Sequence, residues 1–148
     1  TMHRILIANE RSVTPETLEL IRGLPSALDV PRREQALAAS VLATKLGAAT
    51  IVVISKHGIT AKAVSNCRPL VPIHAFVDGE SCCRKLMLVW GIVPHSIVFS
   101  QNTEQTLGRA LAILRKEKAV RKGQRIVIVS DIHAGATAVM TIQIRTMA

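Results

Sequence analysis

The sequence predicts an α/β fold in which helices cover both faces of a mostly parallel sheet. Short apolar, β-branched segments alternate along the chain with segments of helical periodicity, which is the pattern of repeated strand–helix–strand units. The strongest strand signal, Thr50–Ile54, is an unbroken apolar run, as expected for a strand buried on both faces. We therefore expect a three-layer αβα sandwich with a five-stranded sheet and an antiparallel C-terminal edge strand.

Length and composition indicate one domain over residues 1–148. The chain has 148 residues, of which 49% are hydrophobic, so it can form a substantial core and does not read as disordered. Its apolar runs are too short to span a bilayer, and we predict no membrane contact. The start of the chain has no signal-peptide pattern, and Thr1-Met2 is consistent with a piece of a larger protein.

Helices and strands can be placed in order through the first half of the chain. Thr14 and Pro15 are typical of a helix start, and this first helix is expected to end near Arg22. A second helix is expected from Pro31 to Gly47, with an apolar stripe at helical spacing. The strand Thr50–Ile54 follows, and a short helix is predicted from Thr60 to Asn66.

The second half continues the alternation and ends in a hairpin-like pair. Strands are predicted at Ile73–Val77, Ser96–Phe99 and Arg125–Ser130, with one helix from Asp78 or Ser81 to Leu88 and another from Asn102 or Thr103 to Lys118. The final strand, Val139–Thr146, follows a polar loop at Asp131–Thr137. Because that loop is too short to hold a crossover helix, the last strand should pair antiparallel at an edge of the sheet.

The polar turn after the first buried strand is the leading candidate for a binding site. Ser55, Lys56, His57 and Gly58 separate that strand from the helix that begins near Thr60. Unpaired N–H groups at a helix N-terminus, together with hydroxyl groups and a lysine, favour a phosphate or carboxylate. Turn formation and helix capping alone explain the same residue types, and the spacing is neither that of a Walker A loop nor GxGxxG.

Net charge and cysteine content bear on two further functions, nucleic-acid binding and metal binding. The formal charge of +9 keeps nucleic acid under consideration, with the densest basic stretch at Arg115–Arg125. Aromatic residues make up only 2% of the chain, so base-stacking platforms are missing, and cations are also favourable at the end of a helix. The three cysteines, Cys67, Cys82 and Cys83, show no metal-ligand spacing. We therefore expect reduced thiols in a cytoplasmic protein and no metal site.

Several short motifs follow one another along the chain in a characteristic order. They are Met2-His3 through Leu24, Ser55 through Ala61 with Val64, Cys67-Arg68-Pro69, Pro72-Ile73, Arg84-Lys85-Leu86, Trp90 through Pro94 and Val120 through Gln124. In order and spacing these motifs resemble the C-terminal domain of pyruvate kinase. The resemblance covers nearly the whole chain.

This resemblance implies a regulatory and oligomerisation domain. Pyruvate kinase transfers a phosphoryl group from phosphoenolpyruvate to ADP in a (β/α)8 barrel with a lid domain, using magnesium and potassium. Neither the barrel nor the lid is expected in this chain, so we expect no catalytic residues, no cofactor of its own and no activity from the chain alone. The implied partners are the rest of the parent enzyme, further copies of this domain and a phosphorylated effector, often fructose 1,6-bisphosphate.

The resemblance also implies residues for the effector site. The effector's phosphate would be bound by Ser55, Lys56, His57, Gly58 and Thr60. The second wall would be the loop Ser130–Thr137, in which Gly135 is the best match. His133 of this loop is a further candidate, because the fold should bring it and His57 to the same edge of the sheet. The sequence departs from the family pattern at Ile59, Thr106 and Ile132-His133-Ala134, where the sugar-bisphosphate form carries other residues; Arg109 is a possible substitute for the arginine missing at Thr106.

Three interpretations remain open at this point. The chain could be an effector-binding domain, with a sugar monophosphate or another phosphate ligand as the effector. It could be an assembly domain that has lost effector binding. It could also be a basic nucleic-acid-binding module, which the composition favours least.

Overall fold

A computed structural model describes residues 30–134 and 137–148 of the chain. The helix predicted over residues 14–22 lies outside the described residues. Across the part that is described, no helix is long and apolar enough to cross a membrane.

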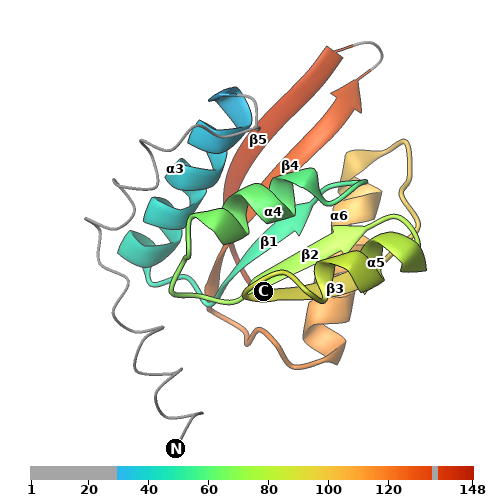
Figure 1. Ribbon diagram of the computed structural model, residues 1–148. Helices are drawn as coiled ribbons and strands as arrows, with labels where there is room; N and C mark the ends of the chain where they lie inside the picture. Colours follow the sequence, from blue (N-terminus) through green and yellow to red (C-terminus); the bar gives the residue numbers. More distant parts are fainter. Residues whose placement is uncertain (1–29, 135–136) are drawn as a thin grey trace, which may run out of the picture.

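The sheet has the predicted class and topology. Its five strands are β1 (Thr50–Ile54), β2 (Ile73–Val77), β3 (Ile92–Ser96), β4 (Arg125–Ala134) and β5 (Thr137–Thr146). They lie in the order β3-β2-β1-β4-β5 (Figure 1). The first four strands are parallel, and β5 pairs antiparallel with β4 at one edge. The mostly parallel sheet with an antiparallel C-terminal edge strand is therefore confirmed.

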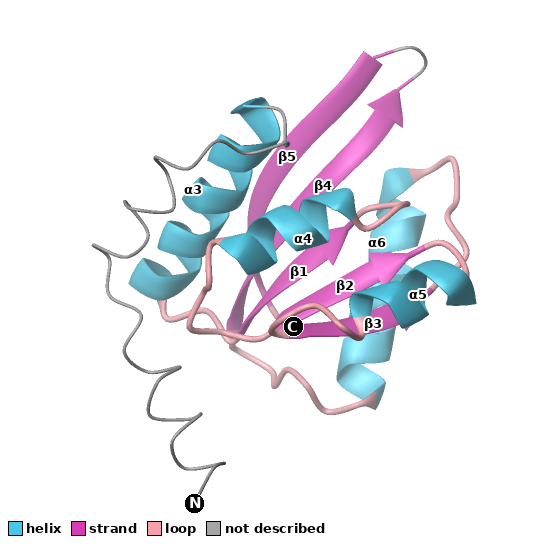
Figure 2. Cartoon of the chain, viewed as in Figure 1, coloured by secondary structure: helices cyan, strands magenta, loops and turns pink. Residues whose placement is uncertain are grey.

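Helices form the outer layers on both faces of the sheet, as Figure 2 shows. The helices α3 (Val30–Leu46), α4 (Ile59–Asn66) and α5 (Glu80–Leu86) cover one face, and α6 (Thr103–Lys116) covers the other. A hydrophobic core lies on each face of the sheet, and alternate residues of β1 point into the two cores. Ile51 and Val53 pack with the first three helices, and Val52 and Ile54 pack with α6. This alternation follows from the two-residue period of a strand.

Small residues allow α3 to lie close to the sheet. Ala36, Ala39 and Ala43 follow one another at helical spacing and are fully buried. Their short side chains bring the helix backbone near β1 and β4, whose residues belong to the same core cluster. The helix ends at Leu46, and the following Gly47 has a φ of 61°, the left-handed conformation common after a helix C-terminus.

The predicted position of the third strand was wrong. It was expected at Ser96–Phe99, whereas β3 runs from Ile92 to Ser96. The Ile73 N–H donates to the Gly91 carbonyl, so the chain enters the sheet directly after this glycine. Pro94 is tolerated because β3 is an edge strand, where one side of the backbone needs no ladder partner.

The loop predicted at Asp131–Thr137 was also wrong, because most of it is strand. β4 continues to Ala134 and β5 already begins at Thr137, with Asp131 opposite Met140 in the ladder. The longer hairpin projects beyond the ends of β1 to β3 (Figure 1). The described residues of the expected second wall, 130–134 and Thr137, are therefore held by backbone pairing.

Candidate functional site

The turn between β1 and α4 has a fixed backbone. The Ser55 N–H donates to the Phe76 carbonyl at 3.1 Å, and the Gly58 N–H donates to the Ser55 carbonyl at 3.2 Å. Gly58 has a φ of 76°, in the left-handed region that glycine adopts at little cost. These two N–H groups are engaged within the protein, and the turn and the helix start also carry the Ser55 and Thr60 hydroxyl groups.

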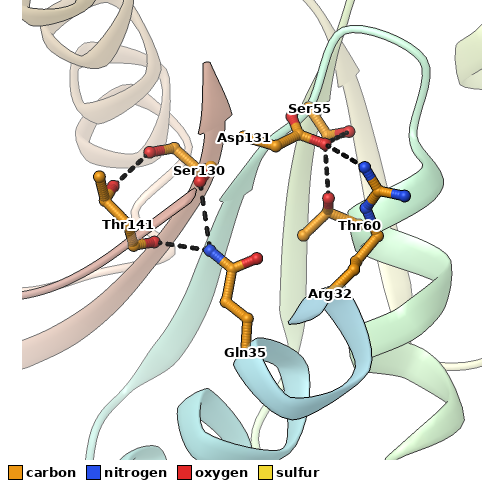
Figure 3. A network of polar contacts seen from close by, with 7 residues as sticks. All are labelled: Arg32, Gln35, Ser55, Thr60, Ser130, Asp131 and Thr141. Carbon is orange, nitrogen blue, oxygen red and sulfur yellow. Dashed lines mark hydrogen bonds and ion pairs between the residues drawn. The ribbon is translucent and has the colours of Figure 1, made fainter. Parts of the chain in front are cut away.

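Two of those hydroxyl groups converge on one carboxylate oxygen. Thr60 Oγ1 donates to Asp131 Oδ2 at 2.6 Å, and Ser55 Oγ donates to the same oxygen at 3.2 Å. Arg32 Nη2 lies 4.0 Å from this oxygen (Figure 3). We call the Ser55 and Thr60 hydroxyls the anion cradle. In this structure the cradle holds a negative group supplied by the chain itself.

The sheet register explains why Asp131 reaches the cradle. β1 and β4 are parallel neighbours with Ile54 opposite Ser130, so the next residues, Ser55 and Asp131, leave the pair side by side. Thr60 returns to the same point from the first turn of α4. This part of the chain was expected to form a wall of the site, but Asp131 was not among the predicted site residues. Its position directly after the predicted strand Arg125–Ser130, at the same edge of the sheet as the polar turn, was the available signal.

A buried glutamine ties α3 to the adjoining hairpin. Gln35 Nε2 donates to the Ser130 carbonyl at 3.2 Å and to the Thr141 carbonyl at 3.0 Å. The Ser130 and Thr141 hydroxyls are 2.5 Å apart (Figure 3). These contacts fix β4 and β5 next to the cradle. They also leave Gln35 Oε1 buried without a hydrogen-bond partner in the described structure.

A pocket of about 270 Å³ opens beside the turn, toward the start of α6. Lys56 and Asp131 bring opposite charges to it, and the remaining lining combines apolar with uncharged polar side chains. Its lining residues are Ile54, Lys56, Phe99, Ser100, Gln101, Thr103, Thr106 and Asp131. The pocket is large enough for a small polar ligand that touches both the turn and the start of α6.

The residues predicted for the effector site are only partly brought together. Ser55 and Thr60 meet at the cradle, and Lys56 lines the pocket. His57 is exposed, and its carbonyl accepts a hydrogen bond from Cys82 Sγ. The backbone of His133 lies in β4 opposite Ala138, whereas its side chain lies outside the described residues. Gly135 itself falls in the segment that is not described, so its predicted role stays a prediction.

The start of α6 supplies the far side of the pocket. Asn102 caps the helix by accepting the Glu104 N–H at 3.0 Å. Thr106 lines the pocket, but its Oγ1 already accepts a hydrogen bond from the Ser100 N–H at 3.0 Å. Arg109, considered as a substitute for a phosphate-binding arginine, donates from Nη1 to the Val98 carbonyl at 2.7 Å. Arg109 is not among the residues that line the pocket.

A second polar cluster lies under α6 and was missed in the sequence. His74 Nδ1 and His95 Nε2 are 3.0 Å apart, and His95 Nδ1 is 3.8 Å from Glu117 Oε1. Burial lowers the pKa of both imidazoles. Among the described residues, no group of three histidine, cysteine or acidic side chains is placed to hold a metal ion.

The chain is similar to pyruvate kinases over most of its length. Residues 34–144 match the family described as pyruvate kinase, alpha/beta domain. Pyruvate kinase isozyme A from the chloroplast of Nicotiana tabacum is 32% identical over 117 residues, which cover 79% of this chain and 20% of the tobacco protein. Pyruvate kinase 2 of Synechocystis is 29% identical over 139 residues, covering 91% of this chain and 22% of the relative.

A solved structure shows the same fold. The structure of Cryptosporidium parvum pyruvate kinase in complex with ADP aligns with a TM-score of 0.79 and 20% sequence identity, over 94% of this chain and 28% of that protein. The chain thus spans about a fifth of the length of the curated relatives described above. By its matched sequence and its sheet topology, the chain belongs to the family of pyruvate kinase α/β domains.

Proposed function

We propose that this chain serves as the non-catalytic C-terminal domain of a pyruvate kinase. The match over residues 34–144 supports this role, as does the short share of its relatives that the chain spans. Phosphoryl transfer from phosphoenolpyruvate to ADP, with its magnesium and potassium ions, would then belong to other domains of the parent enzyme. The part played by this chain is regulation and assembly.

The regulatory part of the proposal is an effector site at the β1–α4 turn. The observation that carries it is the convergence of Ser55 Oγ and Thr60 Oγ1 on a single anionic oxygen. Donors that hold one carboxylate oxygen have the geometry to hold a phosphate oxygen, because both are charged acceptors at similar distances. A sugar phosphate would place its phosphate at the cradle and its sugar in the adjoining pocket, where Lys56 and Thr103 lie.

A second candidate is an assembly domain without an effector, and one observation favours it. Asp131 already fills the cradle, so the turn is complete without a ligand. β5 also lies at the edge of the sheet, where Val139 and Ile144 are 41% and 51% exposed. An edge strand with exposed apolar side chains can pair with a second copy of the chain.

Ligand titration distinguishes the two candidates. We would titrate the 148-residue chain with inorganic phosphate, glucose 6-phosphate and fructose 1,6-bisphosphate by calorimetry. Thr60→Glu should abolish binding, because a second carboxylate would face the phosphate. Since Thr60 is fully buried, Lys56→Glu provides a variant at an exposed position, with Lys62→Glu on the exposed side of α4 as the charge-matched control.

Each outcome of the titration supports or contradicts a different candidate function. Binding that Lys56→Glu weakens and Lys62→Glu preserves would support the effector site. Absence of binding with all three ligands, together with a dimer or tetramer in sedimentation, would favour the assembly domain. A monomeric chain that binds none of them would contradict both proposals.

A further inference from the structure

We propose that Asp131 is an internal competitor for the phosphate site. In this proposal its carboxylate occupies the anion cradle in the resting domain and raises the concentration at which an external phosphate binds. The inference rests on the proposed effector site, and it identifies the residue that sets the affinity of that site.

The position of Asp131 suits an internal ligand. Its backbone lies in the β4–β5 ladder opposite Met140, so the sheet holds it in place. Its side chain is 12% exposed and contacts both hydroxyls of the cradle as well as Arg32. The three contacts come from the turn after β1, the first turn of α4 and the first turn of α3. The carboxylate therefore joins three elements around the point where a phosphate would lie.

The same geometry makes phosphate and Asp131 mutually exclusive. The Thr60 hydroxyl has one hydrogen to donate, and at 2.6 Å that hydrogen is committed to Asp131 Oδ2. A phosphate bound there would have to take this hydrogen and would also face the aspartate charge across a short distance. Like charges this close, away from bulk water, repel strongly. An entering phosphate must therefore displace the carboxylate.

The structure leaves room for the displaced side chain. Asp131 also lines the 270 Å³ pocket beside the turn, so rotation of its side chain could move the carboxylate out of the cradle toward Lys56. Such a movement would exchange the Ser55 and Thr60 contacts for a position near a lysine. Binding of phosphate at the cradle would thus be coupled to a new position of the Asp131 side chain in this pocket.

The test compares phosphate binding in variants that keep or remove this carboxylate. The probe is inorganic phosphate, titrated into the 148-residue chain at constant ionic strength. Asp131→Asn keeps the shape but removes the charge, and Asp131→Ala also empties the cradle. Asp78→Asn is the control, because Asp78 follows β2 at the same edge of the sheet and its side chain is exposed.

We expect both Asp131 variants to bind phosphate at least tenfold more tightly than the unmodified chain, and Asp78→Asn to change affinity less than twofold. Adding Ser55→Ala to Asp131→Ala should reverse most of the gain, which would place the bound phosphate at the cradle. Equal phosphate affinity with and without Asp131 would overturn the competition while leaving the effector site standing. Absence of binding even in Asp131→Ala and Asp131→Asn would overturn the effector site and the competition together.

A measurement on the unmodified chain covers the case in which the variants do not fold. The side-chain carboxyl 13C resonance of Asp131 should shift as phosphate saturates the site, because the carboxylate leaves its two hydroxyl donors. A resonance that stays constant while phosphate binds would contradict the displacement. The Asp78 carboxyl resonance serves as the internal reference.

Discussion

His74 Nδ1 lies 3.0 Å from His95 Nε2, and the two imidazole rings are stacked in the interior under α6. His95 also stacks on Phe76 with ring centroids 4.8 Å apart. One of the two facing nitrogens must donate and the other must accept, so this contact requires at least one neutral ring. If both rings were protonated, two N–H groups would point at each other.

This pair predicts a loss of stability in mild acid. Burial is the largest cause that lowers the pKa of both histidines, and each is opposed by Glu117, which raises it. Because the folded pKa values lie below those of the unfolded chain, the unfolded state binds more protons over this interval. The free energy of unfolding should therefore be constant between about pH 7 and pH 8 and fall as the pH drops below about 6.5, the ordinary histidine value.

Urea denaturation between pH 8 and pH 5 measures this effect. His74→Gln removes one titrating group and keeps a hydrogen-bonding side chain, so its unfolding free energy should depend less on pH. His57→Gln is the control, because His57 is exposed and its loss should leave the pH dependence unchanged. Identical pH profiles for His74→Gln and the unmodified chain would show that the pair does not cause the effect.

A side chain at Gly58 is expected to destabilise the fold. Its φ is 76°, and an added Cβ would lie 3.0 Å from Leu86 Cδ1. Gly58→Ala combines left-handed strain with this close contact, and we expect a loss of about 1–3 kcal/mol in unfolding free energy. Gly47→Ala is the matched control, because Gly47 also has a positive φ of 61° but nothing within 4 Å of the added carbon. Equal losses in both variants would mean that the contact with Leu86 is relieved at no cost.

Gln35 predicts an unusual order of stability among its variants. Its amide nitrogen donates to the Ser130 and Thr141 carbonyls, so Gln35→Leu leaves carbonyl groups without this partner and should cost about 1–3 kcal/mol. Gln35→Glu should cost more, because a buried carboxylate would face those carbonyl oxygens with no hydrogen to donate. Thermal denaturation at pH 8 would compare them, and a glutamate variant as stable as the leucine variant would contradict the proposed contact.

The sheet and its helices could be read from the sequence because the signals are local. The unbroken apolar run Thr50–Ile54 and the capped helix after Asn102 each depend on near neighbours in the chain. The β3 error arose at Pro94, because proline usually argues against a strand, whereas an edge strand accepts it. Whether a strand lies at an edge depends on the whole sheet, which a local pattern does not contain.

The candidate site was predicted only in part for a similar reason. Ser55 and Thr60 belong to one short segment, and both reach the cradle. Their acceptor, Asp131, lies 71 residues beyond Thr60, and only the pairing of β1 with β4 brings it there. The prediction of an anion at this turn was made from donor groups alone. No local sequence pattern indicated that a carboxylate of the chain itself would occupy this position.

The Thr60–Asp131 hydrogen bond should contribute measurably to stability without any ligand. Thr60 is fully buried and donates at 2.6 Å to a carboxylate, and hydrogen bonds to charged groups contribute about 1.5–3 kcal/mol. Thr60→Val should lower the unfolding free energy by about that amount, whereas Thr146→Val, at the exposed end of β5, should change it by less than about 0.5 kcal/mol.

A double-mutant cycle then isolates the pair. With Asp131→Ala already present, Thr60→Val should cost at least about 1 kcal/mol less than it does alone, because residues that share one contact are not additive. Urea denaturation of the four proteins, at a pH above 7 where the buried histidines are neutral in both states, gives the four free energies. Additive losses would show that the two side chains act independently. The interaction between the cradle and the Asp131 carboxylate would then contribute nothing measurable to stability.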